Sequence, residues 1–366
     1  MAMKPQVREL GAEVFLIDTA MSGYDGITAA YLIRGDRPCL VETGTATSAP
    51  VVRAALGGLG VGPDDLATIV VTHVHLDHAG GVGDLAAAYP RARIVVQDSG
   101  ARHLADPSRL MASARRVFGT QMDELFGELL PTAAERIDAI GVVGAVDLGG
   151  GRRLEAHHTP GHARHHLGLV DSVTGDLYVG DASGLYIPPD DADLMTGIGG
   201  DGRSGAMVPA TPPPDFDLDL AVASLRRMGD LGGTRLLFSH YGPITRVGES
   251  LERAAEEMRV WVDLVRNSRR QVDGGEGGAG GARGGSVGGA GEGGGEAGGG
   301  AGVGGAGAAV AFDVDHAVAM VREKTRERYA DLIARPEVAA KFEALSSSSA
   351  NVVGIARWLD TVDAAR

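Results

Sequence analysis

Residues 69–81 of this chain read Ile69-Val70-Val71-Thr72-His73-Val74-His75-Leu76-Asp77-His78-Ala79-Gly80-Gly81. Three histidines and one aspartate lie close together, directly after an apolar run that predicts a short buried strand. Side chains two residues apart in an extended segment point the same way, so His73 and His75 can hold one ion. Asp77 and His78 follow where a helix begins, and they point toward a neighbouring position. The spacing therefore predicts two metal ions rather than a chance crowding of polar residues in a loop.

Three later motifs place single ligand-type residues at the ends of predicted strands. Thr159-Pro160-Gly161-His162 predicts a tight turn that presents His162, because Pro fixes the backbone and Gly allows a close approach. Gly180-Asp181 ends a predicted hairpin, and the buried strand that starts at Arg235 delivers His240 at its carboxyl end. Each motif alone is a modest signal, but their order after the first motif strengthens all of them.

Together these motifs resemble the signature of the metallo-β-lactamase fold hydrolases, the superfamily that includes glyoxalase II. The resemblance covers roughly residues 12–245. It implies an α/β fold, a four-layer αββα sandwich, here with a C-terminal helical appendage. It also implies a ligand set in which His73, His75 and His162 hold the first ion, Asp77, His78 and His240 hold the second, and Asp181 bridges the two.

The sequence departs from the family pattern at two places. Glu42-Thr43-Gly44 stands where the family usually carries Asp-Thr-Gly, so Glu42 is expected to lie under the metal site with one extra methylene. Relatives often follow the Thr-Pro-Gly-His motif with a second Pro-Gly-His, whereas this chain has Ala163-Arg164-His165-His166, which concerns the pocket wall. Four further histidines are expected to be strand or supporting residues rather than ligands: His157, His158, His165 and His166.

Histidine and carboxylate ligands without thiolate suit two divalent ions, with Zn²⁺ favoured and Fe or Mn as alternatives. The resemblance implies a hydrolase in which a hydroxide bridging the metals attacks a thioester, ester or lactone carbonyl, as in glyoxalase II. Asp77 is the expected catalytic residue, because it can orient the hydroxide and accept its proton. The alternatives are a di-iron redox or oxygen-binding protein on the same fold, and a lactonase or β-lactamase-type hydrolase. A scaffold with a dead site is disfavoured because no ligand is missing.

Composition narrows the partners of the chain. The 366 residues carry a net charge of −14, which argues against nucleic-acid binding because that requires clustered Lys and Arg. The single cysteine, Cys39, excludes an intramolecular disulfide. The sequence contains neither an apolar run of signal-peptide length at the N-terminus nor a membrane-length apolar stretch. We therefore expect a small-molecule substrate, no nucleic-acid or membrane partner, a cytoplasmic location by default, and a possible homodimer through the C-terminal helices.

Four regions follow from the changes in pattern. The predicted boundaries are a catalytic domain at 1–247, a helix of the C-terminal appendage at 248–272, a Gly-rich disordered linker or insertion at 273–310, and a C-terminal helical segment at 311–366. The linker is predicted because 21 of the 34 residues from Gly274 to Gly307 are Gly, which cannot form a core.

The secondary structure is predicted from apolar periodicity and turn residues. Expected strands are 13–17, 28–33, 38–41, 67–71, 91–97, 154–158, 166–170, 177–179 and 235–240, and expected helices are 48–59, 83–88, 218–228, 249–270, 313–334, 336–345 and 351–362. Residues 100–146 are expected to form two or three helices that pack on the body of the domain, with a role as a wall of the substrate pocket as the alternative that the resemblance offers. Residues 184–217 are expected to form a substrate-contacting loop, with Tyr186, Met195 and Met207 as pocket residues.

Overall fold

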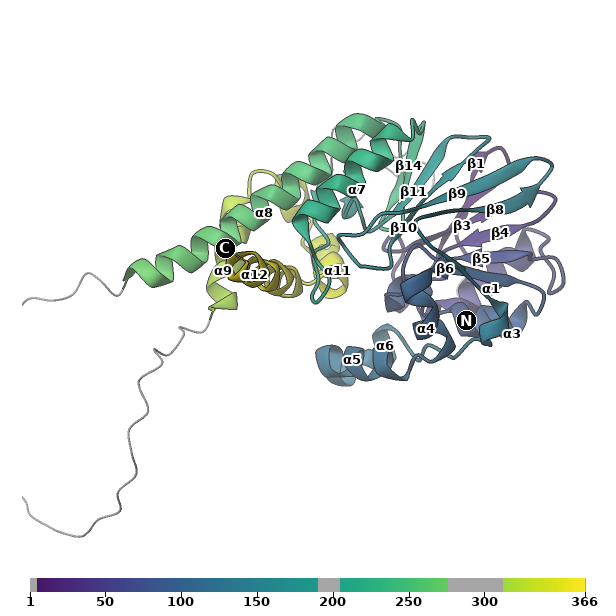
Figure 1. The fold of residues 1–366 in the computed structure, drawn as a ribbon, viewed down its shortest axis with the longest axis horizontal. Helices are drawn as coiled ribbons and strands as arrows, with labels where there is room; N and C mark the ends of the chain where they lie inside the picture. The colour runs from purple at the N-terminus through teal and green to yellow at the C-terminus, as the bar shows by residue number, and fades with distance from the viewer. Residues whose placement is uncertain (1–4, 190–204, 276–311, 366) are drawn as a thin grey trace, which may run out of the picture.

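Two β-sheets stack face to face, and helices cover the outer face of each (Figure 1). The computed structural model describes residues 5–189, 205–275 and 312–365. The first sheet runs in the order β1 (Val7–Gly11), β2 (Val14–Asp18), β3 (Ala29–Ile33), β4 (Cys39–Val41), β5 (Thr68–Val70), β6 (Arg93–Gln97) and β7 (Ile137–Ile140). The second runs in the order β15 (Gly242–Ile244), β14 (Arg235–Phe238), β11 (Asp176–Gly180), β10 (Leu167–Asp171), β9 (Arg152–His158) and β8 (Val143–Gly149). This is the four-layer αββα sandwich that the family resemblance implied.

Parallel pairing brings several carboxyl ends of strands to one edge of the sandwich. In the first sheet β4, β5 and β6 are parallel neighbours. In the second sheet β11 is parallel to β14. Because chemistry-bearing residues follow β5, β11 and β14 in the sequence, this topology gathers them at the same edge.

Apolar residues of the two sheets fill the space between them. Leu16 of β2 and Tyr31 of β3 share this core with Leu169 of β10 and Tyr178 of β11. The rings of Tyr31 and Tyr178 meet edge to face at 5.4 Å, an arrangement that the aromatic quadrupole favours. Cys39 is also buried here, and burial raises the pKa of its thiol, so it is a core residue as expected.

The helices cover the outer faces of the two sheets and extend the second one. Their bounds are α1 Ala49–Gly58, α2 Leu76–Ala79, α3 Val82–Ala88, α4 Asp98–Ala105, α5 Ser108–Phe118, α6 Met122–Leu125, α7 Leu218–Asp230, α8 Val247–Gly275, α9 Val314–Lys324, α10 Ala330–Ile333, α11 Pro336–Leu345 and α12 Ser348–Ala364. Residues of α7, α8, α9 and α12 join the second sheet in one apolar cluster, which contains both Trp261 and Trp358. The C-terminal helical region is therefore continuous with the core of the second sheet.

Two predicted helical regions are partly wrong. Residues 100–146 form α-helices only as far as Leu125, followed by a 3₁₀ turn at Ala134–Arg136, and their end forms β7 and the start of β8, the edge strands of the two sheets. Strand β7 pairs with β6, and β8 pairs with β9. This pairing, rather than local sequence pattern, determines the structure of the end of the region. The predicted helix 313–334 is broken into α9 and α10, and Tyr329, directly before α10, donates a hydrogen bond to buried Glu257 of α8 at 3.0 Å.

The predicted loop 184–217 contains a small two-stranded sheet, β12 (Leu185–Ile187) and β13 (Ala206–Val208). Tyr186 and Met207 face each other across this ribbon and are fully buried in the core, so their expected role as pocket residues is wrong. Met195 and most of the predicted Gly-rich linker lie outside the described residues. Strand β1 was not predicted, because its half-exposed residues carry too little apolar pattern.

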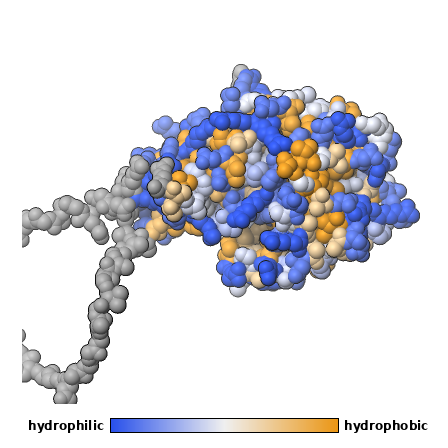
Figure 2. Space-filling model, in the orientation of Figure 1, coloured by the Kyte–Doolittle hydropathy of each residue, from blue (hydrophilic) through white to orange (hydrophobic). Residues whose placement is uncertain are grey.

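The surface in Figure 2 is mostly hydrophilic, and its apolar residues form several small patches rather than one continuous face. Such dispersed apolar side chains are ordinary on a folded surface. Among the described residues, the helices are all too short or too polar to span a lipid bilayer.

Candidate metal centre

The seven predicted ligands come together at the edge of the sandwich where the parallel strands end. The loop after β5 and the short helix α2 carry four of them, and the turns after β9, β11 and β14 carry one each. They fall into three overlapping groups: His73, His75 and His162; Asp77, His78 and His240; and His73, His78 and Asp181.

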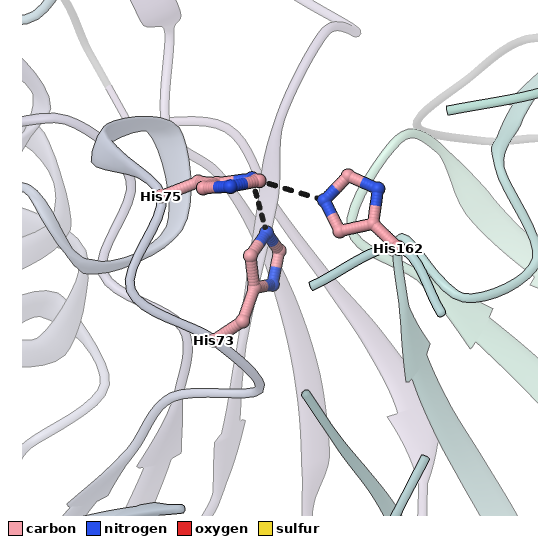
Figure 3. Close-up of side chains that lie close together, drawn as sticks. All are labelled: His73, His75 and His162. Carbon is pink, nitrogen blue, oxygen red and sulfur yellow. Dashed lines mark hydrogen bonds between the residues drawn. The ribbon is translucent and has the colours of Figure 1, made fainter. Parts of the chain in front are cut away.

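The first group consists of three histidines whose ring nitrogens converge (Figure 3). His75 Nδ1 lies 3.0 Å from His73 Nε2 and 2.9 Å from His162 Nε2. His162 Nδ1 donates to the carbonyl oxygen of Ala210 at 2.9 Å, which leaves the Nε2 lone pair directed inward. His73 Nδ1 lies 3.0 Å from the Thr72 hydroxyl, which acts as its acceptor because that hydroxyl donates to Glu42.

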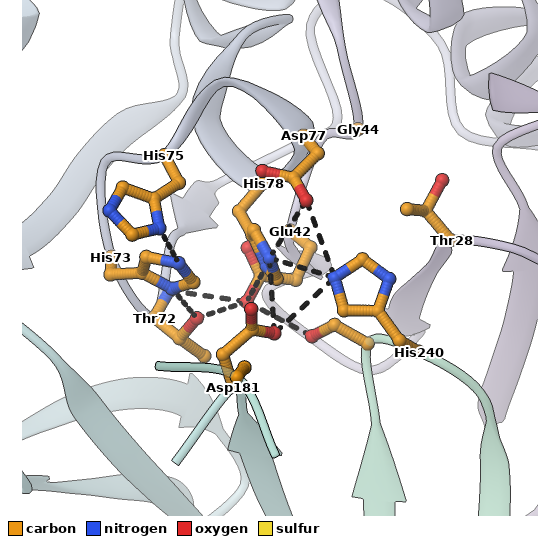
Figure 4. Close-up of polar contacts among 12 residues, drawn as sticks. Thr28, Glu42, Gly44, Thr72, His73, His75, Asp77, His78, Asp181 and His240 are labelled. Carbon is orange, nitrogen blue, oxygen red and sulfur yellow. Dashed lines mark hydrogen bonds and ion pairs between the residues drawn. The ribbon is translucent and has the colours of Figure 1, made fainter. Parts of the chain in front are cut away.

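The second group adds a carboxylate to two histidines (Figure 4). The Nε2 atoms of His78 and His240 are 3.1 Å apart, and Asp77 Oδ2 lies 3.6 Å and 3.4 Å from them. His240 Nδ1 donates to the carbonyl oxygen of Ile27 at 3.0 Å, so its Nε2 also faces the group. A histidine held through one nitrogen with the other aimed into the site is the usual arrangement for a metal ligand.

Asp181 lies between the two groups. Its Oδ1 is 3.2 Å from His78 Nε2 and 3.3 Å from His240 Nε2, while its Oδ2 is 3.5 Å from His162 Nε2. Oδ1 is buried and makes no hydrogen bond with good geometry among the described residues. A buried carboxylate oxygen with no hydrogen bond among inward-facing imidazoles fits a site built for cations. The donor set, histidine nitrogens and carboxylate oxygens, therefore suits divalent metal ions.

Protonation separates the two groups in the metal-free protein. Burial lowers the pKa values of His73, His75 and His162, and the crowding of imidazoles adds to this for each of them. Burial acts in the same direction on His78 and His240, but Asp181 and other acceptors outweigh it: the pKa of His78 lies well above its usual value, and that of His240 is raised to about 9. The first group is thus neutral at pH 7 and the second carries protons.

The carboxylates are ionised in both positions. Burial raises the pKa of Asp77, but His78 and His240 outweigh it and lower the value to about 2. Burial likewise opposes ionisation of Asp181, yet the same two histidines and His162 hold its pKa well below the usual range. The side chain of Asp77 is 15% exposed and that of Asp181 only 8%, so Asp77 is the more solvent-accessible of the two carboxylates.

Several residues contact the seven predicted ligands and help to hold them in place. Glu42 Oε1 accepts from the Thr72 hydroxyl at 2.5 Å and lies 3.6 Å from His78 Nδ1, so this carboxylate sits under the site as expected. The sequence interpretation missed Thr72, which links Glu42 to His73. A hydroxyl directly before the first histidine was the available signal.

The four additional histidines stay outside the three groups, as expected. His166 accepts from the backbone N–H of Asp181 at 3.2 Å and contacts the Thr159 hydroxyl at 2.8 Å, so it fixes the turn that carries Asp181. His165 accepts from the N–H of Val74, and its ring lies 6.0 Å from that of His75. His157 and His158 belong to β9.

Comparisons with known proteins agree with this geometry. The chain is 29% identical over 209 residues to the metallo-beta-lactamase fold-containing protein ST1585 of Sulfurisphaera tokodaii, across 55% of this chain and 72% of that protein. It is 25% identical over 261 residues to the probable metallo-hydrolase YqjP of Bacillus subtilis, across 66% of this chain and 75% of that protein. A putative diflavin flavoprotein of Nostoc is 23% identical over 270 residues, which cover 70% of this chain but 40% of the relative.

The solved structure of ST1585 superimposes with a TM-score of 0.54 and 25% sequence identity, covering 68% of this chain and 86% of the archaeal one. The family model of the metallo-beta-lactamase superfamily matches residues 23–240, which is more than half of the 366-residue chain and spans all seven predicted ligands. From the fold, the convergent histidines and aspartates and this match, we conclude that the chain belongs to the metallo-beta-lactamase superfamily.

Proposed function

We propose that this protein is a dinuclear metal-dependent hydrolase that cleaves a thioester, ester or lactone. The observation that carries the proposal is the pair of ligand groups with Asp181 between them. A carboxylate shared by two cations lowers their mutual repulsion and keeps them about 3.5–4 Å apart, the separation typical of two-metal hydrolytic sites. The name of the Bacillus relative, a probable metallo-hydrolase, is consistent with this chemistry.

Within the proposed centre each residue has a defined task. His73, His75 and His162 would hold the first ion, and Asp77, His78 and His240 would hold the second. Two bound divalent ions supply a water of lowered pKa as nucleophile and an electrophile for the carbonyl oxygen. Asp77 would orient that water and accept its proton, because Asp77 is ionised at neutral pH and is the more exposed of the two carboxylates. Asp181 is more buried, so it holds position rather than exchanging protons with solvent.

The substrate is proposed only as a carbonyl compound. Glyoxalase II uses basic residues of its C-terminal helices to bind glutathione, but here Arg328 pairs with Glu257 at 2.9 Å and Arg322 pairs with Glu343 at 3.0 Å. These ion pairs engage both guanidinium groups within the helical region. An apolar cavity of about 470 Å³ lies beside them, between β12, β13 and the C-terminal helices, and none of the seven predicted ligands lines it.

The test is metal analysis coupled to a substrate panel. Protein loaded with Zn²⁺, Fe²⁺ or Mn²⁺ is assayed against thioesters, esters, lactones, β-lactams and phosphodiesters. We expect two equivalents of metal and hydrolysis of a carbonyl substrate, with both reduced in Asp181→Ala and unchanged in a matched control, Asp98→Asn on α4. The proposal fails if no panel member is hydrolysed while Asp181→Ala leaves the metal content unchanged.

A di-iron redox protein is the second candidate, and the similarity to the Nostoc diflavin flavoprotein favours it. Nearly the same ligand types serve both chemistries. The described C-terminal residues, 312–365, are entirely helices and turns, whereas a flavodoxin-like partner domain would contain a parallel sheet. Purified protein that carries iron, with a visible absorption band that responds to dithionite and to oxygen, would favour this candidate over hydrolysis.

A further inference from the structure

One peptide group connects the metal centre to the C-terminal helix α12. The carbonyl oxygen of Ala210 accepts the Nδ1–H of His162 at 2.9 Å, and the N–H of Thr211 donates to Asn351 Oδ1 at 2.6 Å. This carbonyl and this N–H belong to the same peptide unit, which is trans. The two groups of a trans peptide point in opposite directions within one rigid plane. His162 and Asn351 therefore hydrogen-bond to opposite edges of the same rigid peptide plane.

Asn351 is itself held in one orientation. Its Nδ2 donates to the Ser346 hydroxyl at 3.1 Å, so its Oδ1 faces Thr211. The Thr211 hydroxyl adds a bond to the backbone oxygen of Asn351 at 3.2 Å. Both residues are buried, with exposed fractions of 2% for Asn351 and 0% for Thr211. Water therefore does not compete for these hydrogen bonds.

Gly354, one turn later in α12, allows this close approach. A Cβ at this position would lie 1.9 Å from the carbonyl oxygen of Thr211 and 2.8 Å from the carbonyl carbon of Pro212. Neither atom can move away without shifting the backbone of the segment that contains the peptide. Helix α12 therefore contacts this segment through two of its residues: the fixed amide of Asn351 and Gly354, which has no side chain.

We propose that Asn351 is a positioning residue for His162. Through the Ala210–Thr211 peptide, α12 would thereby set the metal affinity of the first group. An N–H that donates to Asn351 polarises its own peptide and makes the Ala210 oxygen a stronger acceptor. A stronger acceptor holds the imidazole in the required tautomer and raises the basicity of Nε2, which faces the first group. This inference rests on the proposed metal centre but not on hydrolysis.

The two ligand groups differ in this support. His240 of the second group donates instead to the carbonyl oxygen of Ile27, which precedes β3 in the first sheet. A loss of Asn351 should therefore weaken one metal equivalent and leave the other unchanged. General destabilisation of the fold would affect both equivalents alike, so the selectivity separates positioning from a merely structural role.

The experiment is a competition titration of the full-length, metal-free protein with Zn²⁺ and a chromophoric chelator, without substrate. His162→Ala first identifies the equivalent that belongs to the first group. We expect Asn351→Ala to weaken that equivalent by about 10-fold to 100-fold, the usual range for an outer-shell partner, and to leave the other one unchanged. Gly354→Ala perturbs the same peptide by sterics, and we expect it to weaken the same equivalent.

Two further variants complete the test. Val352→Ala removes buried apolar contacts from the same helix but none of the hydrogen bonds to Thr211, and it should leave both affinities unchanged once the protein is folded. Asn351→Asp keeps the acceptor oxygen and should restore the first equivalent. The inference is overturned if Asn351→Ala and Gly354→Ala spare the first equivalent, if both equivalents weaken together, or if Asn351→Asp binds as poorly as Asn351→Ala. These readouts need no activity, so a protein that binds two ions without hydrolysis would refute the proposed function alone.

Discussion

The two ligand groups of the centre are built from similar residues but differ in charge. The first group has three imidazoles whose pKa values are lowered by burial and by one another. The second has two imidazoles beside Asp77, and their pKa values are raised by carboxylates. Several carboxylates together outweigh burial in the second group, whereas Asp181, the carboxylate that acts most strongly on His162 of the first, does not do so there. In the metal-free protein the first group is therefore neutral, whereas the second group holds protons that a bound metal would replace.

The largest effect is expected from removing the carboxylate that both groups face. Asp181→Asn keeps the size of the side chain but removes its negative charge, so the two ions would repel each other without compensation. We expect loss of at least one metal equivalent and a fall in hydrolysis of more than about 100-fold, since changing even an outer-shell partner costs about 10–100-fold. Metal analysis and kcat/KM on the best substrate measure both quantities.

Asp176→Asn is the matched control for this change. Asp176 is also a buried aspartate of β11, but it pairs with Arg235 at 2.7 Å rather than with the histidines. It should lower the free energy of unfolding and leave the metal content unchanged. If Asp181→Asn kept both equivalents, the two groups would be independent sites.

The second prediction concerns protons released when metal binds. The histidines of the second group hold protons in the metal-free protein, with the pKa of His240 raised to about 9 and that of His78 also raised. Zn²⁺ must displace these protons, so binding at pH 7 should release between about one and two protons per protein. The number should fall as the pH rises through about 9. Calorimetric titrations in buffers of different ionisation enthalpy measure it.

The same shifts give the pH dependence of the metal-free fold. A histidine with a raised pKa stabilises the folded state fully below its unfolded value near 6.5, and this contribution is lost as the pH rises through about 9. The first group acts in the opposite sense, because lowered pKa values make folding less favourable as the pH falls below about 6.5. His240→Gln should reduce the loss at high pH to the part that His78 contributes. Denaturant titrations of the metal-free protein at pH 6 and pH 9 measure this, and an unchanged loss in the variant would contradict the prediction.

The sequence predicted the ligand-type residues better than their support. All seven residues lie in short motifs at strand ends, where residue type and spacing are visible locally. The acceptor for His162 is the backbone oxygen of Ala210. Every residue has a backbone carbonyl, so the sequence does not reveal which one accepts this bond. Asn351 is 140 residues from its partner Thr211, so only the folded chain reveals that contact. Strands β7 and β8 were missed for the same reason, because pairing with β6 and β9 determines them.

The third prediction tests the support of the first group from its other side. Thr72 accepts from His73 Nδ1 and donates to Glu42, so Thr72→Val keeps the shape of the side chain but removes both bonds. The first equivalent should weaken by about 10-fold, the low end of the range for outer-shell partners. The second equivalent should change less, because His78 approaches Glu42 directly at 3.6 Å. Equal weakening in a chelator titration would contradict this division.

The smallest effect is expected at His165, where the chain departs from the family pattern. Its Nδ1 accepts from Val74 at 3.3 Å, so the proton sits on Nε2, and burial lowers its pKa to about 4. The ring is thus a neutral hydrogen-bond donor beside His75 of the first group. His165→Ala should raise KM by about 5-fold, the equivalent of one ordinary hydrogen bond, with kcat and metal content nearly unchanged. A drop in kcat with constant KM would instead place His165 among the groups that act on the transition state, which would extend the first group beyond its three histidines.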